Sequence, residues 1–232
     1  MKLSRSTLIF VPAALSLLLL GLSACEDPAA DKAKATVSSA APAATSAAPK
    51  ATTAMTAAPT SKPAAGDSLP IDAAASTIGF VGSKAVGKHE GKFTKFSGAL
   101  TLAGGKAEGG KVNVEIDLDS VKSDDEKLDT HLKAPDFFDV AKFPKATFTS
   151  TEIKTGGEKG ATHTVTGEFE LRGSKKTISF PATITAGAEE TTATAEFSIN
   201  RKDFGIVYAG MKDNLIRDEV LIKLALKARK AK

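Results

Sequence analysis

From residue 67 onward, apolar side chains recur at every second position of the chain. In the clearest case Val112, Val114, Ile116 and Leu118 alternate with Asn, Glu and Asp side chains. Such alternation predicts a strand with one face in a core and the other in water, as in antiparallel sheets. About eight such strands, separated by Gly-rich joints, predict an all-β domain over residues 67–232, either a sandwich or an up-and-down barrel.

One stretch of this domain lacks the alternation. Residues 123–126 read Ser-Asp-Asp-Glu, which is a capping-box pattern, and acidic side chains suit the first turn of a helix. We therefore expect a short helix over about 124–133 that ends at Pro135. A second short turn carrying Phe137 and Phe138 is expected to follow it.

The N-terminus has the layout of a secretory signal. Two basic residues precede an apolar run over residues 8–21, which is shorter than the roughly 20 residues that a membrane span needs. The run ends in Leu-Ser-Ala-Cys at Cys25, which resembles the bacterial lipobox. We predict a lipoprotein signal peptide over residues 1–24 and lipid attachment at Cys25. The alternative is a plain signal peptide with an unused cysteine.

A lipidated Cys25 would hold the protein on the periplasmic side of a bacterial cell envelope. Two or more acyl chains anchor a protein stably where one does not. The residue after Cys25 is Glu26 and not the Asp of the inner-membrane retention signal, which favours the outer membrane over the inner one.

Residues 26–66 have a biased composition. Ala, Pro, Thr and Ser fill 31 of these 41 positions, and none is aromatic. Such a segment cannot bury enough apolar surface to offset its ordering entropy. We predict that residues 25–66 form the lipidated cysteine and a disordered tether, or alternatively a glycosylated stalk.

The charges and the single cysteine exclude several classes of function. The formal net charge is +4, with both signs interspersed through the domain and no basic stripe among aromatic residues, so nucleic acid is not expected as a partner. One cysteine cannot form a disulfide within the chain, nor build a Cys-rich metal site.

Two motifs with possible chemistry are incomplete. Residues 82–88 follow the phosphate-loop spacing, but His89 occupies the Ser/Thr position and the sequence continues as a strand. The three histidines, His89, His131 and His163, lack metal-ligand spacing, although a site assembled by the fold remains an alternative. We predict no catalytic residue, no metal site and no cofactor.

The order of segments in the domain resembles the YceI-like family of exported bacterial proteins. The most specific match is the run Asp-x-His-Leu, Asp-Phe-Phe-Asp, Phe-Pro and Thr-Phe over residues 129–148. Further matches are Ser76-x-Ile78-x-Phe80, Gly91-x-Phe93, Phe96-x-Gly98, Ser120-Val121-Lys122, Val165-Thr166-Gly167, residues 201–206 and Asp218-Glu219-Val220. The resemblance implies an antiparallel, up-and-down, eight-stranded lipocalin-like barrel with a short helical insertion. It also implies binding of polyisoprenoids or other long-chain lipids.

The chain departs from the family pattern at three positions. Lys84 and Arg172 stand where the family usually has histidine, and Leu128 stands where it has arginine. We infer that a ligand with an anionic head could pair with Lys84, Arg172 or Arg201 near the barrel mouth. The alternative is that these are exposed charges at strand ends.

The inward positions of the predicted strands give candidates for an apolar lumen. A lining of Phe, Ile, Val and Leu suits a hydrocarbon chain, because desolvation of apolar surface supplies roughly 25 cal/mol per Å². Phe137 and Phe138 could line the mouth or form a lid, and the alternative is a dry core. The lumen candidates are Phe80, Phe96, Leu100, Val114, Ile116, Phe148, Phe169, Phe197 and Ile199.

These observations predict a lipid-anchored envelope protein that binds a long-chain isoprenoid-type lipid for carriage or sequestration. A non-catalytic stress-response or interaction module with an incidental lipid is the alternative. A third possibility is an enzyme acting on a lipid-like substrate through His131 or Asp129.

Overall fold

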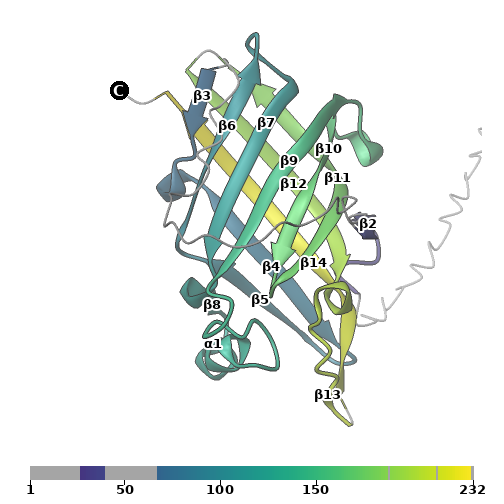
Figure 1. The fold of residues 1–232 in the computed structure, drawn as a ribbon. Coiled ribbons are helices and arrows are strands. Elements are labelled where there is room, and N and C mark those ends of the chain that lie inside the picture. Colours follow the sequence, from purple (N-terminus) through teal and green to yellow (C-terminus); the bar gives the residue numbers. More distant parts are fainter. Residues whose placement is uncertain (1–26, 40–66, 188, 213, 231–232) are drawn as a thin grey trace, which may run out of the picture.

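A computed structural model describes residues 27–39, 67–187, 189–212 and 214–230 (Figure 1). The predicted signal peptide, the lipid attachment at Cys25 and residues 40–66 of the predicted tether lie outside the described residues.

The described residues form one sheet of 14 strands, with one α-helix and four short 3₁₀ helices. The helices are α1 (Glu126–Lys133), η1 (Ala73–Ala75), η2 (Leu118–Ser120), η3 (Glu158–Gly160) and η4 (Arg201–Phe204). The strands are β1 (Ala33–Lys34), β2 (Thr36–Ser39), β3 (Asp67–Pro70), β4 (Thr77–Lys84), β5 (Lys88–Phe93), β6 (Phe96–Ala103), β7 (Lys106–Asp117), β8 (Val121–Ser123), β9 (Lys145–Thr155), β10 (His163–Leu171), β11 (Ser174–Ala186), β12 (Glu190–Asn200), β13 (Gly210–Met211) and β14 (Asn214–Arg229).

The sheet is an antiparallel up-and-down meander that curls around an interior cavity. From β6 through β7, β9, β10, β11 and β12 to β14, each of these strands is hydrogen-bonded to the next. The last long strand, β14, then pairs with the first long strand, β4, so that Leu224 lies opposite Ile78. The all-β barrel class and the helical insertion are confirmed.

The strand count differs from the predicted eight because short strands add to the long ones. Eight of the strands have at least eight residues each. The others have two to six residues and lie at turns, at bends or at the sheet's edges. Such short pieces carry too few residues for alternation to be detected.

The alternation in the sequence translates directly into burial along β7. Val112, Val114 and Ile116 are buried, whereas Asn113 and Glu115 between them are exposed. These three buried side chains point into the barrel because successive strand residues face opposite sides of a sheet.

The turn between β10 and β11 is set by its two central residues. Arg172 and Gly173 both have positive φ, of 53° and 71°, between the paired residues Leu171 and Ser174. This is the geometry of a two-residue hairpin whose twist matches that of the strands. Gly173 is required there, because an added Cβ would lie 2.6 Å from the ring of Phe143.

Helix α1 begins two residues later than the sequence suggested. Its N-cap is Asp125, whose side chain accepts a hydrogen bond from the Lys127 amide, rather than Ser123. Ser123 instead donates from its amide and its hydroxyl to the buried Asp129 carboxylate, at 2.6 and 2.7 Å. These hydrogen bonds hold the pKa of Asp129 below its usual value, and they fix α1 against β8.

The prediction of a disordered tether is wrong for residues 27–39. Within this segment β1 pairs with β12 and β2 pairs with β11. Strands β11 and β12 pair with each other only through Thr183–Ala186 and Thr191–Thr194, so both have free edges beyond that point. The segment fills this seam, and Ala33 and Ala35 are buried in it.

The beginning of this segment packs on the outside of the barrel. Ala29 covers Val81 and Leu221, which point outward from β4 and β14 and are nevertheless buried. Asp27 forms an ion pair with Arg217 on β14, at 3.1 Å. Within the described residues, no helix has the length and apolarity needed to span a membrane.

Candidate functional site: an apolar cavity inside the barrel

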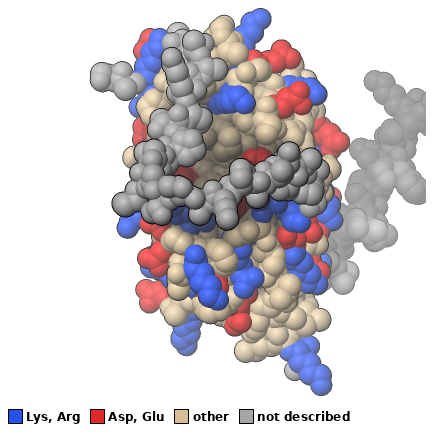
Figure 2. All heavy atoms as spheres, in the orientation of Figure 1, with Lys and Arg blue, Asp and Glu red and all other residues tan. Residues whose placement is uncertain are grey.

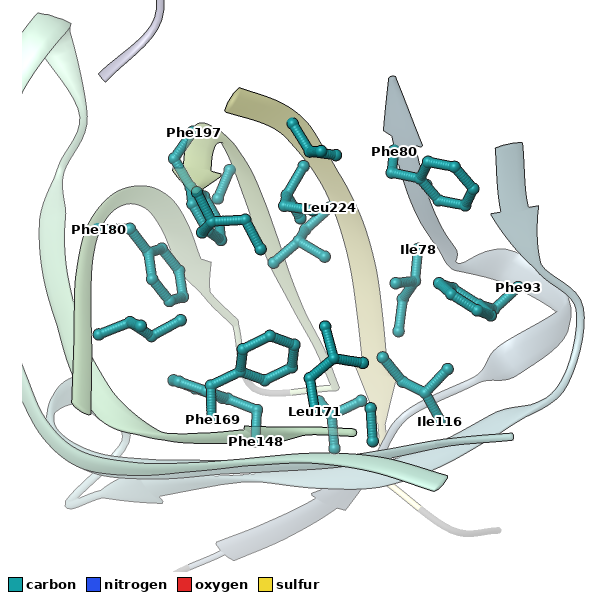
Figure 3. Close-up of a pocket in the computed structure, with 18 of the residues that line it drawn as sticks. Ile78, Phe80, Phe93, Ile116, Phe148, Phe169, Leu171, Phe180, Phe197 and Leu224 are labelled. Atoms are coloured by element: carbon teal, nitrogen blue, oxygen red, sulfur yellow. The ribbon is translucent and has the colours of Figure 1, made fainter. Parts of the chain in front are cut away.

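The barrel surrounds a cavity of about 210 Å³. Strands β4, β5, β6, β7, β9, β10, β11, β12 and β14 all contribute to its wall, together with α1 and the turn that follows it. Figure 3 shows the labelled side chains pointing from these strands into the same space. The wall is apolar almost throughout, so a ligand in it would be held by desolvation and shape rather than by hydrogen bonds.

Two groups of phenylalanine rings dominate the wall. Phe80, Phe93 and Phe138 contact one another with ring centroids 5.8 to 6.4 Å apart. On the other side, Phe180 stacks on Phe197 with centroids 4.1 Å apart and an interplanar angle of 13°. This stacked pair crosses the seam between β11 and β12, where the N-terminal segment is inserted.

Most of the predicted lumen residues line the cavity. Those in the wall are Phe80, Leu100, Val114, Ile116, Phe137, Phe138, Phe148, Phe169, Phe197, Ile199 and Arg201.

Three candidates, Phe96, Lys84 and Arg172, do not line it. Phe96 is half-buried at the start of β6 and pairs with Ile116, which lines the cavity, but Phe96 itself is not part of the wall. Lys84 is half-buried as the last residue of β4.

The sequence reasoning missed several residues of the wall. Strand β14 contributes the largest omitted group, and Phe93 and Phe180 complete the two ring clusters. The sequence of β14 shows the same alternation of apolar and polar residues, so the same reasoning predicts that its apolar residues line the cavity. The omitted β14 residues are Ile216, Val220, Ile222, Leu224 and Leu226.

Arg201 is buried, and its guanidinium is engaged by the protein itself. Its nitrogens donate to the carbonyl oxygens of Ile206, Ile216 and Arg217, at 2.7, 3.3 and 3.0 Å, and to the Asp218 carboxylate at 3.2 Å. Burial lowers the pKa of Arg201 from its ordinary value, and Asp218 offsets part of this effect. Arg201 therefore joins η4 to β14, and it is not the exposed strand-end charge of the alternative interpretation.

Arg172 joins two loops that cover one end of the cavity. It donates to the carbonyl oxygen of Gly205 and to that of Pro135, the latter at 2.7 Å. The same two loops meet through Tyr208, whose ring lies 5.0 Å from that of His131 and 5.4 Å from that of Phe137. The turn after α1 and the loop after η4 thus form one cap, and Phe137 and Phe138 in this turn line the cavity.

The titratable groups of the described residues do not converge on one centre. His89 contacts Asp124 at 2.9 Å, and His131 lies 3.6 Å from Asp136. In the part of the chain that the structure describes, no three His, Cys, Asp or Glu side chains are arranged to hold a metal ion. The Asp129 carboxylate is occupied by Ser123 and Lys122.

The family model of the YceI-like domain matches residues 69–228. A UPF0312 protein of Pseudomonas putida (strain W619) is 37% identical over 122 residues, which cover 50% of this chain and 62% of that protein. One from Pseudomonas fluorescens (strain SBW25) is 35% identical over 122 residues, with the same coverage. The chain therefore spans less than two thirds of the length of these curated relatives.

Solved structures share the fold. BcnA of Burkholderia cenocepacia is 28% identical, with a TM-score of 0.61 over 68% of this chain and 99% of BcnA. A domain from Saccharophagus degradans, described as polyisoprenoid-binding, is 20% identical, with a TM-score of 0.55 over 70% of this chain and 98% of that domain. At that identity the second likeness shows the fold alone.

Proposed function

The chain belongs to the YceI-like domain family, and we propose that it binds a long-chain lipid of the isoprenoid type inside its barrel. In this proposal the protein is non-catalytic, and it carries or sequesters the lipid at the cell envelope. The observation that carries the proposal is the apolar wall built from nine strands around one cavity.

The chemistry of the wall favours a hydrocarbon chain over a polar ligand. The two phenylalanine clusters offer broad apolar faces, and Arg201 in the wall has its nitrogens bound to the protein's own oxygens. The cavity is larger than the ~150 Å³ that accommodates benzene and smaller than the ~300–1,000 Å³ of pockets for drug-sized ligands. A long chain therefore enters with its end first and moves side chains of the wall as it advances.

We also infer that Cys25 carries acyl chains that anchor the protein in the membrane, with the outer membrane favoured. The lipobox-like residues before Cys25 and the apolar run over residues 8–21 support this inference. The periplasmic location follows from the same residues and belongs to the same proposal.

Native mass spectrometry of the full chain, purified from its own envelope, tests both parts at once. We expect one recurrent isoprenoid mass that dissociates as a non-covalent ligand, and a covalent acyl mass on Cys25. An empty or randomly filled barrel would instead support the interaction module with an incidental lipid.

A substitution in the wall makes the test specific. Ala182→Phe places a ring in the cavity, and we expect it to lower the amount of bound lipid several-fold. Thr185→Phe lies on the outer face of the same strand, at an exposed position, and should retain the ligand. Equal lipid content in the two variants would show that the ligand binds elsewhere.

A further inference from the structure

The large apolar side chains that are exposed in the described residues gather at one end of the barrel. They are Val86, Val207, Met211 and Leu215, which are exposed to 69%, 65%, 77% and 55%. Val86 is in the turn between β4 and β5, whereas Val207 lies in the loop after η4, Met211 in β13 and Leu215 in β14. We call these four side chains the apolar tip.

The two turns of the apolar tip are joined to each other. The Ala85 amide donates to the Leu215 carbonyl at 3.0 Å, and the Val86 amide donates to Oδ1 of Asn214 at 3.3 Å. Strand β13 projects beyond the body of the barrel, next to the end of β4 (Figure 1). In Figure 2 the surface at this end is largely tan, with blue side chains at its lowest point.

We propose that the apolar tip inserts into the interfacial region of a lipid bilayer. The position of the N-terminal segment, which begins at Asp27, favours a lipid bilayer as the surface that the tip meets. Asp27 is held by Arg217 on β14, two residues beyond the exposed Leu215. Cys25 precedes Asp27 by two residues, so their Cα atoms are at most about 7 Å apart. Acyl chains on Cys25 would therefore enter the membrane beside the tip.

The shape of the tip also favours a bilayer over a protein partner. A stable protein interface buries about 800 Å² on each side, with complementary packing over 20 or more residues. Here four side chains stand on two narrow turns. Lys84 and Lys212 flank them, and such stems can lie along apolar surface while their ammonium groups stay among lipid head groups.

The tip shares its backbone with the wall of the cavity. Ile206 and Ile216 line the cavity, and each is adjacent in sequence to an exposed residue of the tip, Val207 and Leu215. Membrane insertion would thus bring the capped end of the cavity to the bilayer surface, where a lipid tail has a short path into the barrel. This consequence rests on the proposed lipid-binding function, whereas insertion of the tip does not.

A fluorophore at the tip tests the proposal in the full chain. When Cys25 is acylated through its sulfur, Met211→Cys supplies a single free thiol for an environment-sensitive dye, and Ala103→Cys supplies one in the β6–β7 hairpin at the opposite end. In vesicles of phosphatidylethanolamine and phosphatidylglycerol, we expect the dye at position 211 to brighten several-fold. A quencher attached to the lipid chains should then quench it, while the dye at position 103 stays unchanged.

The same measurement in a Cys25→Ser background separates the tip from the anchor. Brightening in either background supports insertion, since the anchor only raises the local concentration of the tip. If position 211 remains in water in both backgrounds, the proposal is overturned. The lipid content of these variants is measured alongside, so loss of the cavity ligand and loss of membrane insertion are read separately.

Discussion

Arg201 is a buried side chain that stabilises the barrel, because its guanidinium group is bound by the protein's own oxygen atoms. We expect Arg201→Leu to lower the free energy of unfolding by at least about 3 kcal/mol, because the carbonyl oxygens of Ile206, Ile216 and Arg217 lose their donor. Lys202→Leu is the matched control. Lys202 is half-exposed and pairs with the same Asp218, so its loss should cost under ~1 kcal/mol. Urea unfolding followed by circular dichroism measures both. Unchanged stability with lost lipid in Arg201→Leu would instead identify Arg201 as a ligand of the head group.

At this scale, the sequence predicted which way side chains face better than what they contact. The alternation of inward and outward positions placed Phe148 and Phe197 in the wall correctly, because it fixes which face of a strand each side chain occupies. It also placed Phe96 there, although Phe96 is not part of the wall, so the face of a strand does not by itself decide which side chains reach the cavity. The carbonyl partners of Arg201 lie in the loop after η4 and on β14, and no local sequence pattern predicts contacts of this kind.

Among the elements, the N-terminal segment over residues 27–39 is the least expected. Ala35 is buried where the segment enters the core, whereas the neighbouring Thr36 is exposed. Because an unpaired carboxylate is costly to bury, Ala35→Asp should detach the segment rather than unfold the barrel. We expect amide hydrogen exchange to become at least about tenfold faster at residues 36–38, while the β12–β14 ladder keeps its protection. Thr36→Asp serves as the control. Equal loss of protection throughout the sheet in Ala35→Asp would show that the segment is part of the cooperative core.

Composition misled the prediction for this segment because it was averaged over residues 26–66. Residues 29–41 contain no proline, and Thr36-Val37 is favourable for a strand. What decides the outcome is the pair of free edges on β11 and β12, a feature of the folded sheet that local sequence does not reveal. Long strands such as β7 and helix α1 were predictable, since their signals are local.

For the whole molecule, the strand pairing that forms the barrel also determines how much space its interior has to fill. The pairing of β14 with β4 brings the last long strand beside the first, and the cavity remains because the inward side chains do not fill the space. The strand pattern in the sequence left the choice between a sandwich and a barrel open. Only the resemblance of the segment order to the YceI-like family pointed to the barrel.

Lipid removal should therefore lower the stability of the whole barrel. At ~24 cal/mol per Å³, a cavity of about 210 Å³ corresponds to a cost of about 5 kcal/mol when it is not filled. A ligand present at one hundred times its dissociation constant stabilises the folded state by about 2.7 kcal/mol. We expect solvent-extracted protein to unfold at a lower urea concentration than the same protein refilled with a long-chain isoprenoid alcohol. The Ala182→Phe variant, whose added ring occupies part of the cavity, should show a smaller difference between its extracted and refilled forms. An equal shift in both proteins would place the stabilising lipid on the outside of the barrel, since only an internal ligand competes with the added ring for the same space.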